Sequence, residues 1–215
     1  MNGNTGVDER ARVVSSLIER SEIYRAIFAR VALFTGALSI LVAIGIYLNN
    51  ETKLTIGRSV RAREFATFWI SIFVLEIVAS LFFLAREARR SGRPLLSAEF
   101  KLVLNQLKPF PIIPVAFTGW FFTTGYLGAQ ELNLVVVWIA FYGLMLLSTS
   151  IFAPRGVVGL GWAFLLTSLS VPVIANLIEG YVSIDVPNVL MGGTFGLYHL
   201  IYAAFNWRGK SASAA

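Results

Sequence analysis

The chain has 215 residues, of which 56% are hydrophobic and 14% charged, with one histidine and no cysteine. It is too apolar for a soluble domain of this length, so we expect much of its surface to face lipid. The absence of cysteine excludes disulfides, thiolate metal sites and cysteine nucleophiles. A net charge of +6 is typical of nucleic-acid binding, but topology explains it better in a membrane protein, so no nucleic-acid partner is expected.

The first segment, residues 1–30, is expected to be a cytoplasmic domain of its own. Over 8–30, apolar side chains recur at helical spacing and charged ones gather opposite them, which predicts an amphipathic helix on the membrane surface. A helix that binds a partner or forms a dimer is the alternative. The long charged stretch is unlike a signal peptide, so we expect the first membrane span to remain as an anchor.

Six apolar runs approach the ~20 residues that a helix needs to cross a bilayer. They lie at 31–48, 65–85, 110–128, 132–153, 157–178 and 188–207. We therefore predict an all-α fold, a polytopic bundle of six transmembrane helices that occupies residues 31–207. A short cytoplasmic tail, 208–215, follows it.

Lysine and arginine are divided unequally between the two sides of such a bundle. Five precede the first span, six follow the second, one follows the fourth and two follow the sixth, whereas four lie in the first outer loop. The positive-inside rule therefore predicts that both termini are cytoplasmic. The first outer loop, 49–64, is the one segment that runs against this orientation.

A second amphipathic helix is predicted in the cytoplasmic loop after the second span, at 97–108, from apolar residues at i, i+3, i+4 and i+7. A cluster of arginines precedes it, where each can gain about 1 kcal/mol from anionic lipid. The cluster consists of Arg86, Arg89, Arg90 and Arg93. We expect these arginines, and Arg155 between the fourth and fifth spans, to fix topology or bind lipid headgroups. A specific lipid or partner site is the alternative.

Small residues four positions apart predict helix-packing faces, because they let two backbones approach closely where lipid offers no hydrophobic drive. Gly192 and Gly196 form such a pair in the sixth span. Gly159 and Ala163 form another in the fifth span.

Ionisable residues deep in membrane spans are costly, usually face the bundle interior and often mark functional sites. Glu76 in the second span and His199 in the sixth lie at nearly the same predicted depth. We hypothesise that they meet. The alternatives are that His199 bonds a neighbouring carbonyl or hydroxyl group, or that it lines a water-filled path. Further polar candidates are Tyr142, Asn176 and Glu179.

Catalytic motifs are missing, because one histidine cannot supply the zinc-protease or di-iron patterns and no serine-nucleophile motif accompanies it. We expect no enzyme activity, metal or cofactor. The first interpretation is a non-catalytic structural, regulatory or interaction component that contacts anionic lipid, a protein partner or a second copy. The alternative is a transporter or channel for a small solute, ion or proton that uses Glu76 and His199.

Four short motifs occur in order along the chain after the first span. They are R-x-A-R-R at 86–90, a proline pair at 109 and 111, F-x-P-R at 152–155 and G-x-x-F-G-x-x-H at 192–199. In these motifs the chain resembles an uncharacterised family of six-span bacterial inner-membrane proteins. The resemblance implies topology and a bacterial inner-membrane location, and it marks Arg155 and His199 as motif positions without giving them a role.

Overall fold

The structure is a computed structural model that describes residues 28–48, 58–90, 105, 107–124, 131–150, 154–178 and 186–207. Every long element in this part of the chain is a helix and none is a strand, which confirms the predicted all-α class. The predicted amphipathic helices at 8–30 and 97–108 fall almost entirely outside the described residues.

The described helices follow one another in this order along the chain. The 28–48 helix (Phe28–Leu48) comes first. It is followed by α2 (Arg58–Arg90), α4 (Ile112–Thr124), α5 (Glu131–Ser148) and α6 (Arg155–Ile178). The chain ends in three consecutive pieces, α7 (Val186–Met191), a π-helical segment η1 (Gly192–Tyr198) and α8 (His199–Trp207). These three pieces form the C-terminal helix.

Within the described residues, four helices are long and apolar enough to cross a membrane. They contain Phe28–Leu48, Arg63–Arg90, Glu131–Ser148 and Arg155–Ile174. The helix of the third predicted span begins later than expected, at Ile112, because prolines lack a backbone N–H and the chain forms turns over 108–111 before α4. The sixth predicted span is helical throughout but is divided by η1, so each of its pieces is short.

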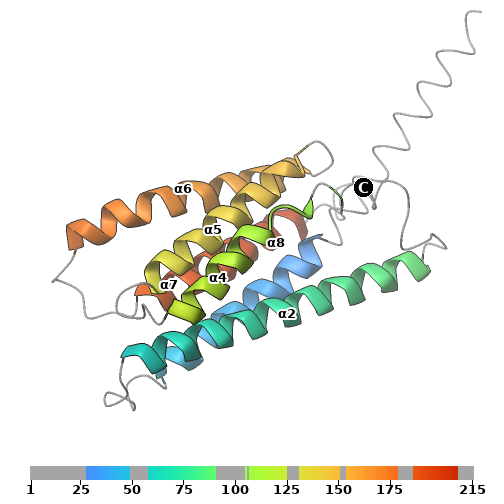
Figure 1. Cartoon of the computed structure of the whole chain (residues 1–215). Helices are drawn as coiled ribbons and strands as arrows, with labels where there is room; N and C mark the ends of the chain where they lie inside the picture. The colour runs from blue at the N-terminus through green and yellow to red at the C-terminus, as the bar shows by residue number, and fades with distance from the viewer. Residues whose placement is uncertain are drawn as a thin grey trace, which may run out of the picture.

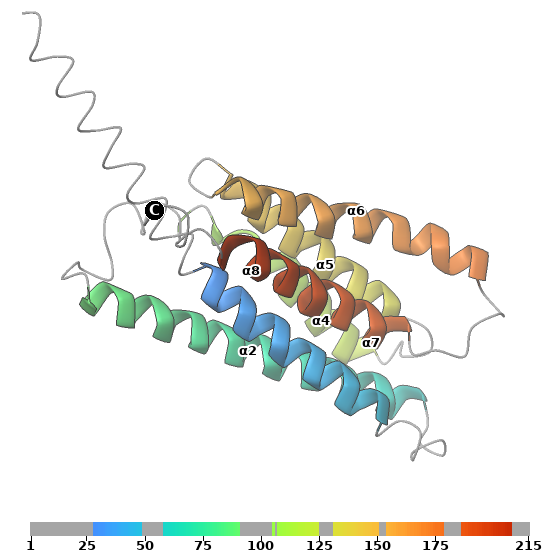
Figure 2. The same cartoon turned by 180° about the vertical axis from the view of Figure 1, so that it is seen from behind.

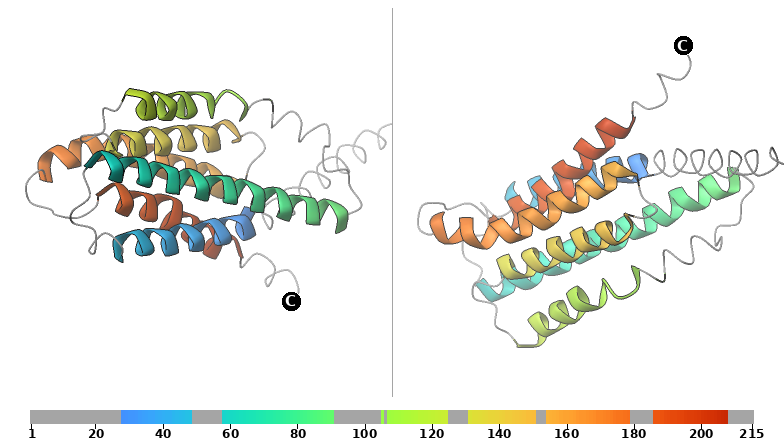
Figure 3. Two further views of the ribbon diagram at one scale, coloured as in Figure 1. Left: turned by 60° about the horizontal axis from the view of Figure 1, so that its bottom comes forward. Right: turned by 90° about the horizontal axis from the view of Figure 1, so that it is seen from above.

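The helices lie side by side and alternate in direction along the chain (Figures 1 and 2). Figure 3 shows α4 at one face of the bundle, α5 and α2 behind it, and the 28–48 helix with the C-terminal helix at the opposite face. Among α2 and the later helices, the most extensive contact joins α5 and α6, and α4 packs on α5. An up-and-down arrangement of this kind is common among helix bundles.

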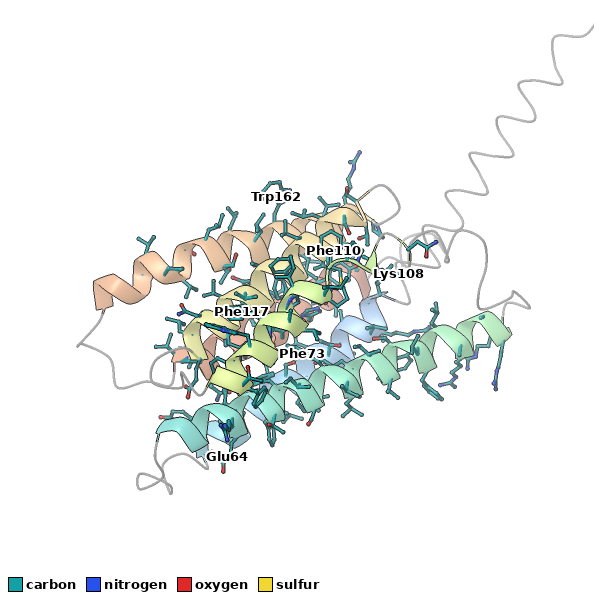
Figure 4. All side chains as sticks on the ribbon, in the orientation of Figure 1. Glu64, Phe73, Lys108, Phe110, Phe117 and Trp162 are labelled. Atoms are coloured by element: carbon teal, nitrogen blue, oxygen red, sulfur yellow. The ribbon has the colours of Figure 1, made fainter. Side chains whose placement is uncertain are left out.

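The bundle is apolar both inside and outside. Its interior holds fully buried aromatic side chains, among them Trp69, Phe121, Phe164 and Phe195. Large apolar side chains also point outward, and Figure 4 shows Trp162 projecting from α6 away from the other helices. A helix that is apolar on every face is typical of a membrane span, because lipid replaces water around it.

Glycines mark the closest helix approaches. A Cβ atom on Gly196 would lie 2.5 Å from Cγ1 of Ile40, and one on Gly192 would lie 2.8 Å from Cβ of Ala43. Both glycines of the sixth predicted span therefore pack on the 28–48 helix. Gly159 differs from the expectation, because nothing lies within 4 Å of its Cβ position.

The close contact of α6 is made two residues further along the helix, by Gly161. A Cβ atom there would lie 3.1 Å from the carbonyl oxygen of Gly143 on α5. One on Gly143 would lie 2.9 Å from the carbonyl oxygen of Gly161 and from the backbone nitrogen of Leu165. The two glycines face each other across the α5–α6 contact, a pairing that the small-residue spacing did not reveal.

Candidate functional site

The carboxyl group of Glu76 lies between α2 and the 28–48 helix. Ser39 Oγ donates a hydrogen bond to Glu76 Oε1 over 3.0 Å. Ser39 is fully buried and Glu76 is 9% exposed. A carboxyl group inside a bilayer is costly unless polar groups surround it, so the serine hydroxyl offsets part of the cost of burying Glu76.

His199 opens α8 and is 4% exposed. Its Nε2 atom lies 2.8 Å from the hydroxyl oxygen of Tyr142, which forms a hydrogen bond between α8 and α5. Aromatic rings cover the imidazole. Phe195 stacks on it with 13° between the ring planes, and Phe164 meets it edge-on with ring centroids 5.6 Å apart. The polar link therefore lies inside an aromatic core.

The π-helical segment η1 leads directly into His199. Short π-helical segments are rare and frequently occur at functional sites. The backbone N–H of His199 donates to the carbonyl oxygen of Gly196. Its imidazole Nδ1 is buried and has no hydrogen-bond partner among the described residues.

Glu76 and His199 do not bond each other, because each side chain has a different partner. Ser39 bonds Glu76 from the 28–48 helix, and Tyr142 bonds His199 from α5. The hypothesis of a direct bond is wrong, and the alternative of a bond from His199 to a neighbouring hydroxyl is what the structure contains. The sequence predicted a similar membrane depth for Glu76 and His199. The rotation of α2 about its axis, however, directs Glu76 toward Ser39.

Three further side-chain hydrogen bonds join helices. They are Trp138 Nε1 to Thr118 Oγ1 at 3.0 Å (α5 to α4), the hydroxyls of Thr167 and Tyr198 at 2.8 Å (α6 to η1), and Asn188 Nδ2 to the carbonyl oxygen of Ala43 at 2.8 Å (α7 to the 28–48 helix). Together with Ser39–Glu76 and Tyr142–His199, these bonds are the interhelical links.

The interhelical links connect the 28–48 helix, α2, α4, α5, α6 and the C-terminal helix into one unit. Each of the six helices takes part in at least one link. Lipid tails are as apolar as leucine, so burying apolar surface does little to hold membrane helices together, and close packing and hydrogen bonds matter more. A link of this kind contributes about 0.6 to 2 kcal/mol.

The remaining predicted residues lie away from this interior. The α2 arginines, Arg86, Arg89 and Arg90, are exposed in the last turns of α2. Arg155 is exposed at the first position of α6. The predictions for Arg93, for Glu179 and for the side chain of Asn176 lie outside the described residues, although the backbone of Asn176 is part of α6.

Sequence reasoning missed Ser39 and the aromatic residues around His199. A serine in a membrane helix can bond its own backbone, as Ser71 does to the carbonyl oxygen of Thr67, and nothing in the sequence distinguishes it from one that bonds another helix. The spacing of Phe195 and His199, one helical turn apart, is the one signal that indicated a shared face.

These features define the class of the part of the chain that the structure describes, a helical bundle with four helices long and apolar enough to cross a membrane and with interior polar groups at helix contacts. Comparison with protein-family models, with curated proteins and with solved structures finds no match for this chain. The resemblance to a six-span bacterial family stays a prediction.

Proposed function

We propose that this chain is a non-catalytic component of the bacterial inner membrane, with a structural, regulatory or interaction role. The observation that carries the proposal is the way in which Glu76 and His199 are bonded. Both are bonded to side chains on other helices, in positions where they hold the bundle together. Intramembrane ionisable groups are a functional hypothesis by default, and here they have a structural use that accounts for their cost.

We propose six spans with both termini in the cytoplasm. The excess of lysine and arginine on the inner segments supports this orientation. So does the alternating direction of the helices, because an even number of antiparallel spans returns the chain to its starting side (Figure 2). In this orientation the α2 arginines reach the cytoplasmic membrane surface.

Anionic lipid is the first proposed partner. The α2 arginines are exposed at the end of a helix whose apolar part is long enough to cross the bilayer, so their guanidinium groups lie at headgroup level. A protein partner or a second copy of the chain is the further proposal, and the apolar outer faces of the helices provide the surface for it.

A transporter or channel for a small solute, ion or proton that uses Glu76 and His199 is the second candidate. It is favoured by one observation, the burial of these two ionisable side chains inside an apolar bundle. Chains of such groups form proton relays in pumps and transporters.

Reconstitution of the full chain into liposomes tests the two candidates. With an imposed pH gradient or a labelled small cation, we expect the flux to equal that of liposomes without protein. A flux that disappears in Glu76→Gln and persists in Glu64→Gln would refute the structural proposal. Glu64 is the matched control, because it is exposed on the same helix and projects away from the bundle (Figure 4).

A further inference from the structure

The 28–48 helix and the C-terminal helix run side by side (Figures 2 and 3). They are closest at two glycines. A Cβ atom on Gly196 would lie 2.5 Å from Ile40 Cγ1, and one on Gly192 would lie 2.8 Å from Ala43 Cβ. One turn before Gly192, a long side chain makes the link instead, because Asn188 Nδ2 reaches the carbonyl oxygen of Ala43 over 2.8 Å. The two helices therefore leave space between them on this side of Gly192.

A groove of about 250 Å³ occupies this space. Ile44 and Tyr47 line it from the 28–48 helix, and Val189 lines it from α7. The small residues Ala43 and Gly192 lie between these walls. The side chains of Ile44, Tyr47 and Val189 are 51%, 49% and 54% exposed, so the groove opens on the outer face of the bundle.

The lining of the groove is apolar and carries no charge. Its other two residues are Ile40 and Asn188, and Asn188 adds little polar surface because it is 2% exposed. Apolar cavities stay dry, and a charged headgroup or a charged peptide would lose its hydration here without gaining a partner. The occupant that complements this lining is an uncharged hydrocarbon.

The depth of the groove places it in the hydrocarbon core of a bilayer. The 28–48 helix has 21 residues and is long and apolar enough to cross a membrane. Ile44 lies about one turn before the end of this helix and Ile40 about two turns before it, at depths of roughly 6 and 12 Å from the helix end. Lipid tails therefore surround the opening of the groove.

The size of the groove distinguishes a lipid tail from a helix of a second copy. A helix is about 10 Å wide, so a length of about 10 Å fills roughly 800 Å³. This is much more than the groove can hold. A cavity of about 150 Å³ accommodates benzene, so by proportion the 250 Å³ groove accommodates roughly ten carbon atoms of a chain.

We propose that this groove binds one hydrocarbon tail of a membrane phospholipid. The tail continues the contact between the 28–48 helix and the C-terminal helix, because it fills the space that begins where their close packing at Gly192 ends. The site is distinct from the proposed headgroup contacts of the α2 arginines, since it takes the uncharged part of a lipid. Only the choice of leaflet, the outer one, rests on the proposed orientation.

Photolabelling tests the proposal on the wild-type chain. The full chain is placed in nanodiscs that contain phosphatidylethanolamine with a diazirine near the middle of one tail, and the labelled residues are identified by peptide mass spectrometry. Leu41 and Leu48 are the matched positions, because they bracket Ile44 in depth on the same helix, lie outside the groove and are 68% and 61% exposed. We expect Ile44 to be labelled severalfold more than either leucine. Labelling that simply follows exposure, with Ile44 the lowest of the three, would overturn the proposal.

A groove-filling variant tests the same site independently. Val189→Phe should reduce the labelling of Ile44 to the level of Leu41, because the larger ring occupies the groove. Val173→Phe, the same change at an exposed position of α6, should leave the labelling unchanged. Undiminished labelling of Ile44 in Val189→Phe would contradict an occupied groove. A second copy as the occupant predicts a dimer in native mass spectrometry that Val189→Phe dissociates and an Ile44 that is shielded from the lipid label, and this result would also overturn the proposal.

Discussion

Substitution of Gly143 by alanine is expected to separate α5 from α6. The new Cβ atom would lie 2.9 Å from the carbonyl oxygen of Gly161 and from the backbone nitrogen of Leu165, whereas ordinary van der Waals contact begins at 3.4 Å. Both atoms belong to the backbone and cannot rotate away. The helices must therefore move apart by about 0.5 Å along an extensive contact.

The magnitude follows from two opposing effects. Overpacking a well-packed interior costs about 1 to 3 kcal/mol, and replacing glycine by alanine inside a helix gains up to about 1 kcal/mol in water. We expect Gly143→Ala to lower the free energy of unfolding by about 1 to 2 kcal/mol. Gly159→Ala, in open space on α6, should leave it unchanged or raise it by up to about 1 kcal/mol.

Reversible unfolding in detergent–lipid bicelles, followed by steric trapping or by tryptophan fluorescence, measures the two variants against wild type. The difference between Gly143→Ala and Gly159→Ala isolates the helix contact, because the residue change is the same in both. Equal free energies of unfolding would refute the close α5–α6 packing.

Three further outcomes are expected. Tyr142→Phe should lower the free energy of unfolding in the same bicelles by about 0.6 to 2 kcal/mol because it removes one interhelical link, whereas Tyr47→Phe should have no effect. Replacing the α2 arginines by glutamine should weaken binding to anionic vesicles by about 1 kcal/mol for each arginine. The same change should raise the amide hydrogen-exchange rates of residues 97–108. Unchanged exchange rates would leave these arginines with a topological role alone. A reporter enzyme fused after Lys210 should be active in the cytoplasm, and a periplasmic signal would reverse every loop assignment.

The helical elements could be predicted from the sequence because each depends on local composition. The apolar runs that begin at 31 and 157 correspond to the 28–48 helix and to α6, which begins at Arg155. The third run shows where this fails, since hydropathy counts the residues around Pro111 as part of a span although the missing N–H groups delay the helix. The π-helical segment η1 could not be predicted either, because hydropathy does not depend on the register of backbone hydrogen bonds.

The sequence predicted Glu76, His199 and Tyr142 as candidates, but it did not predict which hydrogen bonds they form. Ionisable residues are costly in membrane spans, so Glu76 and His199 could be identified as candidates from the sequence without knowing which way their side chains point. Their actual partners depend on how each helix is rotated about its axis and on which helices are neighbours. Ser39 and Tyr142 became partners through that rotation, and a single sequence does not determine it.

The central claim is that Glu76 and His199 form hydrogen bonds that join helices, and that no water-filled path reaches them. The chain has no cysteine, so Ser39→Cys in otherwise unchanged protein places a unique thiol beside Glu76. With a water-soluble thiosulfonate reagent on protein in liposomes, we predict no labelling of Ser39→Cys. Ser150→Cys, exposed in the turn after α5, should be labelled fully once both membrane faces are accessible. Labelling of Ser39→Cys at a rate near that of Ser150→Cys would show a water path to Glu76 and contradict the account.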